Sequence, residues 1–364
     1  MSRVCNCKQG SLPAPAQTHH HSEIEIQPRP RPAMSPPPPS STAAPEPEPY
    51  VVEDCRGVLQ LMSDGTVRRA ADPPFTVEIP ADECGVEWKD VTWEPAHGLN
   101  ARLYRPRHLG AANDARLPVL AYFHGGGFCF GSGRWLNIHA SCLRLCAELP
   151  AVVLSFDYRL APEHRIPAAQ DDGAKALSWL ASAAAAADPW LAAAADFSRV
   201  FLAGDSAGGN IAHHVAAALG GDARVRGAVL VAPAMFGEAR TRAELEAPPG
   251  AFLTVEICER YMRLALSEGC SWDDPLINPA GPRAPPLAAV PMAPVLVVAG
   301  GADLLRDRNR EYARRMKEEW GKDVEYVEIA GAGHGFFQLE PWSEQADQLV
   351  RTVRRFVVDH MDAE

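Results

Sequence analysis

The pattern Gly204-x-Ser206-x-Gly208 combines residue types that could perform nucleophilic chemistry. The apolar residues 200–203 before it have the composition of a buried parallel strand, and residues 211–219 behind it have that of a helix. A serine on such a sharp turn projects its hydroxyl from the edge of a sheet, in a strained backbone conformation that tolerates only small neighbours. We therefore predict that Ser206 is a nucleophile.

A serine hydroxyl needs a base near neutral pH, and the base needs a carboxylate that orients it. Of the histidines downstream of Ser206, His213 and His214 fall on the predicted helix. His360 stands at the end of the last predicted helix, whereas His334 lies in a glycine-rich loop directly after a predicted strand. Such a loop can carry an imidazole over the edge of the sheet, so we predict His334 as the base. The alternative is a loop histidine that only hydrogen-bonds its surroundings.

Two aspartates could orient this base. Asp303 stands just beyond the carboxyl end of the predicted strand 294–299, where the acid of a serine–acid–histidine order is expected. Asp307 stands where the next helix starts, and a carboxylate there stabilises the helix without any catalytic role. We predict Asp303 as the acid and keep Asp307 as the alternative.

Attack on an ester carbonyl creates an oxyanion, which needs N–H donors fixed in advance. The run His124-Gly125-Gly126-Gly127 follows a predicted strand and matches a pattern that supplies such donors from an early loop. A further donor is expected at Ala207, the residue after the nucleophile. The predicted oxyanion hole therefore contains Gly125, Gly126, Gly127 and Ala207.

The elements that must position these residues alternate along the chain. Predicted strands cover residues 100–104, 119–123, 151–156, 200–203, 228–232, 294–299 and 324–329. Predicted helices cover residues 51–62, 138–149, 171–185, 211–219, 255–266, 307–320 and 343–360. Alternation of this kind predicts an α/β fold, with a parallel sheet covered by helices on both faces. Residues 233–290 interrupt the alternation with proline, glycine and charge, and we predict that they form part of a cap over the carboxyl edge of the sheet.

Composition limits the partners that the chain can have. The 46 acidic and 35 basic residues give a net charge of −11, which argues against binding to nucleic acid or to an anionic membrane surface. No apolar run reaches the length of a transmembrane helix. Nine cysteines without the spacing of a disulfide framework are typical of a reducing compartment.

Residues 1–48 differ from the rest of the chain in being rich in proline and polar residues, which predicts a disordered tail. The pair Cys5 and Cys7 and the histidines 19–21 lack the spacing of a zinc site, so we expect no metal there. No apolar segment of a signal peptide follows Met1, and the glutamates of the tail are not typical of a transit peptide. We expect a cytoplasmic protein, which could also enter the nucleus.

The whole set of motifs resembles the plant carboxylesterases of the hormone-sensitive-lipase-like group of α/β-hydrolases. The resemblance covers residues 50–364 and rests on the segments 124–127, 157–164, 204–210, 301–307 and 334–336. It implies a mostly parallel eight-stranded sheet flanked by helices, with a helical cap from residues 50–75 and 233–290. It also implies a serine esterase that uses Ser206, Asp303 and His334, needs no cofactor or metal, and acts on a small-molecule ester. Residues 52–67 are most similar to the carboxylesterases that cleave strigolactones.

Two relatives on the same fold define the alternatives. Gibberellin receptors lack the catalytic histidine and bind a hormone without cleaving it, so His334 favours turnover. Isoflavanone dehydratases can carry threonine at the nucleophile position, which Ser206 argues against. The oligomeric state and the natural ester do not follow from the sequence.

Aromatic residues beside the motifs are the predicted walls of an apolar substrate pocket. They are Phe128, Phe130, Trp135 and Phe336. Each could equally belong to the core.

Overall fold

The computed structural model describes residues 48–73, 75–107, 116–219, 221–248 and 250–362. The disordered tail that we predict for residues 1–48 therefore lies outside the described residues, apart from Glu48, as do Cys5, Cys7 and the histidines 19–21. The account below concerns the unit formed by Pro49–Glu364.

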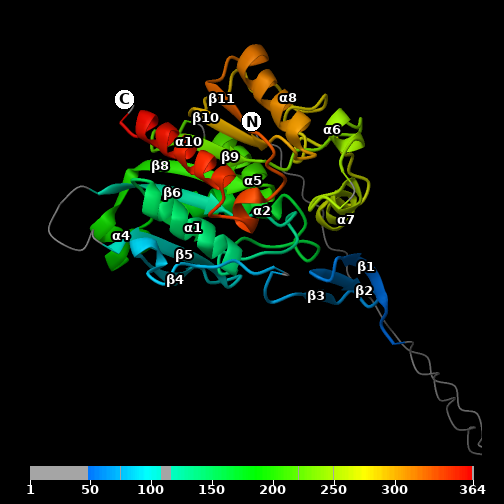
Figure 1. Ribbon diagram of the computed structural model, residues 1–364, viewed down its shortest axis with the longest axis horizontal. Coiled ribbons are helices and arrows are strands. Elements are labelled where there is room, and N and C mark those ends of the chain that lie inside the picture. Colours follow the sequence, from blue (N-terminus) through cyan, green and yellow to red (C-terminus); the bar gives the residue numbers. More distant parts are fainter. Residues whose placement is uncertain (1–47, 74, 108–115, 220, 249, 363–364) are drawn as a thin grey trace, which may run out of the picture. The chain divides into compact units, whose positions relative to one another are not determined.

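An eight-stranded sheet of the order β11-β10-β9-β8-β6-β7-β5-β4 forms the centre of this unit (Figure 1). Its strands are β4 (Val86–Glu94), β5 (Leu99–Pro106), β6 (Leu117–Phe123), β7 (Val152–Phe156), β8 (Ala195–Asp205), β9 (Val225–Val231), β10 (Val295–Gly300) and β11 (Val324–Ile329). The strands from β7 to β11 in this order pair in parallel, and β5 pairs antiparallel with both β4 and β7. The predicted mostly parallel α/β-hydrolase sheet is confirmed.

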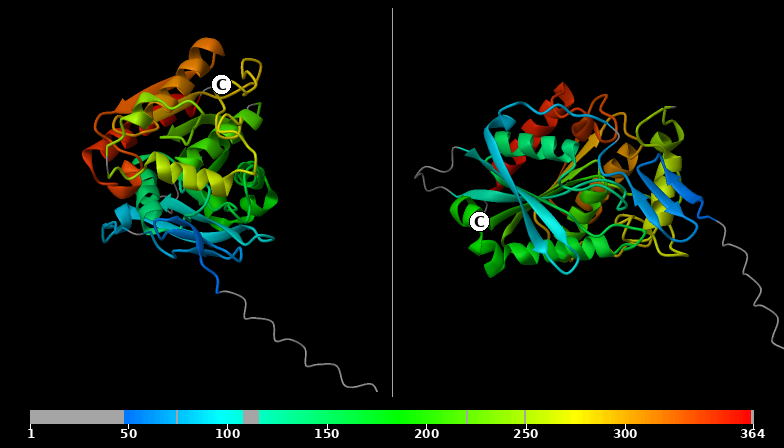
Figure 2. Two further views of the ribbon diagram at one scale, coloured as in Figure 1. Left: turned by 90° about the vertical axis from the view of Figure 1, so that its right-hand side faces the viewer. Right: turned by 90° about the horizontal axis from the view of Figure 1, so that it is seen from below.

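Helices cover both faces of the sheet, as the right-hand view of Figure 2 shows. The longer helices are α1 (Leu136–Glu148), α2 (Ala168–Leu180), α5 (Ala207–Ala218), α7 (Val255–Ala265), α8 (Arg306–Arg314) and α10 (Glu344–His360). Shorter helical segments are η1 (Glu83–Gly85), α3 (Ala183–Ala187), α4 (Pro189–Ala194), α6 (Arg242–Leu245), η3 (Arg315–Glu319) and α9 (Phe336–Leu339). Within the described part of the chain, no helix is long and apolar enough to cross a membrane.

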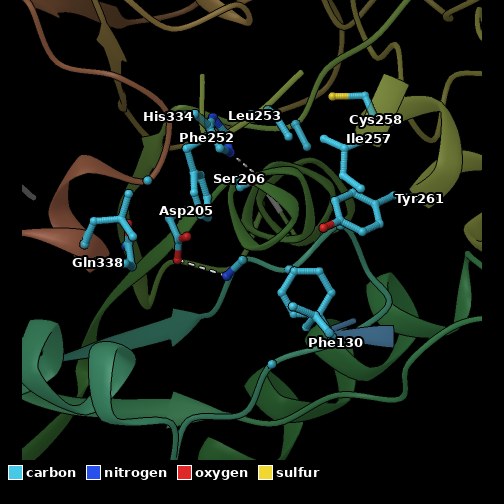
Figure 3. A pocket seen from close by; sticks show the side chains of 18 of the residues that line it. Phe130, Asp205, Ser206, Phe252, Leu253, Ile257, Cys258, Tyr261, His334 and Gln338 are labelled. Atoms are coloured by element: carbon cyan, nitrogen blue, oxygen red, sulfur yellow. Dashed lines mark hydrogen bonds between the residues drawn. The ribbon is translucent and has the colours of Figure 1, made fainter. Parts of the chain in front are cut away.

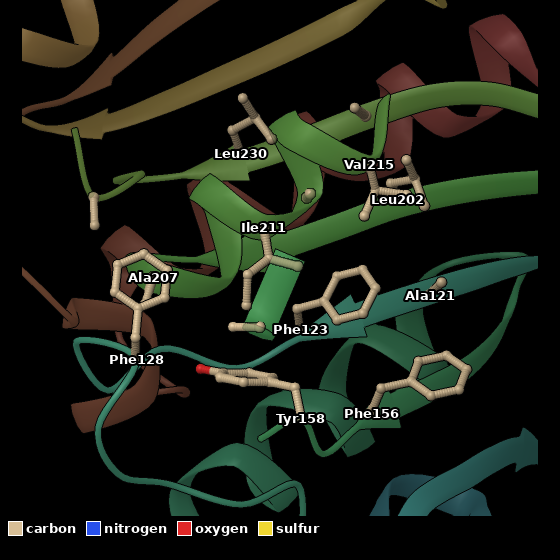
Figure 4. Close-up of a cluster of buried hydrophobic side chains, with 14 of the residues drawn as sticks. Ala121, Phe123, Phe128, Phe156, Tyr158, Leu202, Ala207, Ile211, Val215 and Leu230 are labelled. Atoms are coloured by element: carbon tan, nitrogen blue, oxygen red, sulfur yellow. The ribbon is translucent and has the colours of Figure 1, made fainter. Parts of the chain in front are cut away.

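The strand β6 illustrates why both faces are covered. Successive side chains of a strand point to opposite faces, and here both sets are apolar. Phe123 belongs to the buried cluster that includes α2 and α5 (Figure 4), whereas Leu120 and Tyr122 belong to the cluster that includes α1 and α10. Such near-continuous apolar strands are stable only when both faces are buried.

The first three strands correct the prediction of a helix over residues 51–62. The structure has instead a separate antiparallel sheet of β1 (Val51–Cys55), β2 (Leu59–Met62) and β3 (Val67–Arg69). The cause is a turn in which Arg56 and Gly57 both have positive φ, of 55° and 72°, and in which the Gly57 N–H donates to Asp54 Oδ1. Two successive residues with positive φ cannot belong to a right-handed helix. They form instead a tight turn that reverses the chain into a hairpin.

Charged side chains join this small sheet to the rest of the unit. Glu53 forms ion pairs with Arg260 and Arg263 of α7. Arg69 of β3 donates to the carbonyls of Cys129 and Ala161, at 2.7 and 2.6 Å, and forms an ion pair with Glu163. The sheet is therefore held beside α7 and beside the loop that follows β6.

Candidate active site

Ser206 lies on the sharp turn between β8 and α5, with φ 51° and ψ −117°. A β-carbon on Gly204 would lie 2.3 Å from the backbone of Gly208, and one on Gly208 would lie 1.9 Å from the carbonyl oxygen of Phe123. Both approaches are far inside van der Waals contact, so the structure requires the two glycines for the physical reason that the sequence suggested. The positive φ of Ser206 is the strained conformation expected of a serine exposed in this way.

His334 and Asp303 form a hydrogen-bonded chain with this serine. His334 Nε2 lies 2.9 Å from Ser206 Oγ, and His334 Nδ1 lies 2.7 Å from Asp303 Oδ2. An ionised carboxylate can only accept, so Nδ1 must carry the proton, and Nε2 is left to accept from the serine hydroxyl. The other oxygen of Asp303 accepts the backbone N–H of Leu305 at 2.9 Å, which fixes the orientation of the carboxylate.

The strands explain how these three groups meet. Ser206 follows the end of β8, Asp303 follows β10 and His334 follows β11. These strands run parallel, so their carboxyl ends lie at one edge of the sheet. The sequence order of strands and loops was therefore sufficient to predict that these three residues lie close together.

The alternative residues are engaged elsewhere. Asp307 accepts the backbone N–H of Ala243 at 2.8 Å and pairs with Arg306, in the first turn of α8. His213 Nδ1 lies 2.7 Å from the hydroxyl of Tyr312, and His214 Nε2 donates to a backbone carbonyl.

The environment of His334 favours its protonated form. Burial by itself lowers the pKa of the imidazole, but the charge and hydrogen bond of Asp303, together with the more distant charge of Asp205, outweigh it and raise the pKa above its ordinary value. Asp303 thus has the position relative to the imidazole that an orienting carboxylate has in an acyl-transfer triad.

The glycines of the loop after β6 line the same cavity as Ser206. Gly126 and Gly127 have positive φ, of 120° and 58°, and a β-carbon on Gly126 would lie 2.0 Å from the carbonyl oxygen of Phe130. Among the described residues, the N–H groups of Gly126, Gly127 and Ala207 have no hydrogen-bond acceptor. By contrast, the N–H of Gly125 donates to Asp205 Oδ1 at 3.0 Å. Of the four expected donors, three are free and Gly125 is occupied.

A cavity of about 220 Å³ opens in front of Ser206, and most of its wall is apolar (Figure 3). Phe130 and Trp135 line it, as predicted. Phe128 and Phe336 do not: Phe128 is buried in the core beside α5 (Figure 4), and Phe336 borders a neighbouring hollow behind His334. Phe128 also has a positive φ, of 65°, and its side chain is fully buried.

Sequence reasoning missed part of the wall. Phe252, Ile257 and Tyr261 come from the segment 233–290, and Arg56 comes from the hairpin turn. The sequence of this segment predicted a helix at residues 255–266, which α7 confirms. It did not indicate which face of that helix lines the cavity. Asp205 and Gln338, two polar wall residues, were also missed, although Asp205 lies inside the serine motif itself.

In the part of the chain that the structure describes, no group of three or more His, Cys, Asp and Glu side chains could hold a metal ion.

Comparison with known proteins places this geometry in a family. Residues 120–338 match the family described as α/β-hydrolase fold. Tuliposide A-converting enzyme 2 of Tulipa gesneriana is 38% identical over 291 residues, which cover 79% of this chain and 73% of that protein. The 2-hydroxyisoflavanone dehydratase of Glycyrrhiza echinata is 34% identical over 320 residues, 83% of this chain and 94% of that protein. Probable carboxylesterase 6 of Arabidopsis thaliana is 36% identical over 302 residues, 79% of this chain and 85% of that protein.

Solved structures agree with these sequence relatives. An esterase of Pyrobaculum calidifontis superimposes with a TM-score of 0.63 at 31% identity, over 75% of this chain and 84% of the other. The thermostable carboxylesterase EstE1, cloned from a metagenomic library, gives a TM-score of 0.65 at 31% identity, over 79% of this chain and 92% of the other. The chain therefore belongs to the α/β-hydrolase family, as an esterase-type member related to plant carboxylesterases.

Proposed function

We propose that this protein is a serine carboxylesterase that hydrolyses esters of small, largely apolar metabolites or hormones. The observation that carries the proposal is the hydrogen-bonded chain from Ser206 through His334 to Asp303, which opens onto an apolar cavity. The cavity of about 220 Å³ is smaller than the roughly 300–1,000 Å³ of common ligand sites, which favours a compact ester. Strigolactones are the first natural esters to test, followed by tuliposide A, which the name of a relative gives as its substrate.

The proposed reaction is acyl transfer in two steps. Ser206 Oγ attacks the ester carbonyl while His334 Nε2 accepts its proton, and Asp303 stabilises the imidazolium that forms. The free N–H groups of Gly126, Gly127 and Ala207 bind the oxyanion. The intermediate collapses as His334 protonates the leaving alcohol, and a water molecule then repeats the sequence on the acyl-enzyme. No step requires a metal or an organic cofactor.

Hydrolysis of p-nitrophenyl acetate and of longer acyl esters tests the proposal. We expect turnover by the wild type and a loss of roughly 10⁶-fold in kcat for Ser206→Ala, the scale measured for the nucleophile of a serine protease. Ser178→Ala is the matched control, because Ser178 is exposed on α2 and its hydroxyl donates to the carbonyl of Ala174 in the same helix. A wild type that hydrolyses no ester but binds a small hormone-like ligand would replace this proposal with that of a hormone receptor.

The location in the cell stays a prediction. The sequence favours the cytoplasm or nucleus, whereas several relatives carry the words chloroplastic or amyloplastic in their names. Imaging of the full chain fused at its C-terminus to a fluorescent protein distinguishes the two.

A further inference from the structure

A buried carboxylate stands directly before the nucleophile, and the proposed reaction gives it no task. Asp205 is 7% exposed, and burial raises the pKa of its carboxyl group. A carboxylate in such a place is costly to desolvate unless hydrogen bonds compensate it. Its partners therefore indicate what it does.

The partners of Asp205 form a chain of hydrogen bonds that ends at the loop after β6. Gln338 Nε2 donates to the hydroxyl of Tyr122 at 3.0 Å, and this hydroxyl donates to Asp205 Oδ1 at 2.5 Å. The same oxygen accepts the backbone N–H of Gly125 at 3.0 Å (Figure 3). Tyr122 and Gln338 are 2% and 5% exposed, so water does not compete for these bonds.

This chain joins three segments that carry the proposed chemistry. Gln338 lies on α9, four residues after His334. Asp205 precedes Ser206, and Tyr122 lies on β6 just before the glycine loop. One set of bonds thus connects the base, the nucleophile and the oxyanion loop.

The remaining bonds of the loop show what a fixed Gly125 achieves. The carbonyl of Gly125 lies 2.6 Å from His124 Nδ1, and the carbonyl of Gly126 accepts the N–H groups of Cys129 and Phe130. In a trans peptide the N–H points away from the carbonyl of the same peptide unit. The bonds to the carbonyls of Gly125 and Gly126 therefore fix the planes of both peptide units, and with them the directions of the N–H groups of the next residues, Gly126 and Gly127.

We propose that Gln338, Tyr122 and Asp205 are positioning residues that anchor Gly125 and thereby set the N–H groups of Gly126 and Gly127 for the oxyanion. The inference rests on the proposed esterase function. It also assigns Gly125 the role of an anchor, in place of the oxyanion donor that the sequence suggested.

Tyr122→Phe tests this inference by removing one hydroxyl from the middle of the chain. We expect kcat to fall about tenfold or more while KM stays within about twofold, because the oxyanion forms only in the transition state. The affinity for a boronic acid that mimics the oxyanion should fall by the same factor as kcat/KM. Tyr312→Phe is the matched control: Tyr312 is equally buried, and its hydroxyl bonds His213, away from the cavity.

Two further variants separate positioning from general loss of stability. Asp205→Asn keeps an oxygen that can accept both bonds and should retain more activity than Asp205→Ala. Gln338→Met removes the outermost donor without changing the strands, and it replaces Tyr122→Phe if that variant does not fold.

Amide hydrogen exchange tests the inference without relying on esterase activity. Loss of the anchor should speed exchange at Gly125, Cys129 and Phe130 at least tenfold in Tyr122→Phe or Gln338→Met, and not in Tyr312→Phe. Unchanged exchange and unchanged kcat in both variants would overturn the inference. A wild type without esterase activity would instead refute the proposed function, and the exchange rates would still decide whether the anchor exists.

Discussion

Replacing Asp303 by asparagine changes a single atom, and the structure dictates how the new side chain must lie. The backbone N–H of Leu305 donates to Asp303 Oδ1 at 2.9 Å, so the amide oxygen of an asparagine would keep this place. The amide NH₂ would then face His334 Nδ1, 2.7 Å away in the wild type. Because an NH₂ group can only donate, Nδ1 would have to lose its proton, which would move to Nε2. An Nε2 that carries a proton cannot accept one from Ser206.

The size of the effect follows from this change of tautomer. The equivalent substitution in a serine protease, where geometry is kept and the tautomer is wrong, lowers kcat about 10⁴-fold. We expect a similar loss for Asp303→Asn, or about 5.4 kcal/mol of activation free energy. Asp307→Asn should change kcat less than about threefold, because Asp307 contacts arginines and a backbone N–H on the outside of α8.

Steady-state hydrolysis of p-nitrophenyl esters by the two variants and the wild type provides the comparison. Thermal melts followed by circular dichroism should show both variants folded, so that the loss is one of chemistry. If Asp303→Asn kept more than about a tenth of the wild-type kcat, or lost less than Asp307→Asn, the assignment of the acid would be wrong.

Three further predictions concern pH, the glycine loop and the small sheet. Since Asp303 raises the pKa of His334 against the opposing effect of burial, kcat/KM should fall on acidification with a midpoint above the ordinary value of about 6.5, and a pH–rate profile flat from about pH 5 to 8 would exclude His334 as the base. Gly126→Ala places a β-carbon 2.0 Å from a carbonyl oxygen and should lower kcat by about 10²-fold or more, whereas Gly221→Ala, with no atom within 4 Å of the new carbon, should leave kcat unchanged. Arg69→Met leaves two backbone carbonyls without their donor and should lower the free energy of unfolding by about 2 kcal/mol in urea denaturation; a change below about 0.5 kcal/mol would show that this side chain does not hold the small sheet.

The proximity of Ser206, Asp303 and His334 could be predicted because each of these residues follows a strand in the sequence. Ser206 and Asp303 follow β8 and β10, which end in buried apolar runs, and His334 follows the edge strand β11. Parallel strands bring their carboxyl ends together, so the three residues meet at one edge of the sheet. Local pattern and global fold agree at these positions.

Apart from Phe130 and Trp135, the cavity wall could not be predicted in this way, because it is assembled from segments far apart in the chain. Tyr261 and Phe252 reach it from the segment 233–290, and Arg56 reaches it from the small sheet. The prediction at residues 51–62 failed for a related reason. The apolar residues at positions 58, 59, 61 and 62 suit the period of a helix or of a strand, and the deciding feature was the left-handed turn at Arg56 and Gly57.

Asp205 lies within the motif that positions Ser206, but its own role does not follow from the sequence of that motif. The sequence explains the glycines around Ser206 by steric need, and it leaves the aspartate without a reason. The reason appears only when Gly125, 80 residues earlier, is seen to donate to the carboxylate. The negative charge of Asp205 would repel a developing oxyanion. We expect the stabilisation of the oxyanion by the N–H groups of Gly126 and Gly127 to exceed this repulsion. The same charge favours the imidazolium of His334, which forms at the same moment as the oxyanion. In the proposed mechanism, Asp205 therefore stabilises the imidazolium by its charge and positions the N–H donors of the oxyanion through the backbone of the glycine loop.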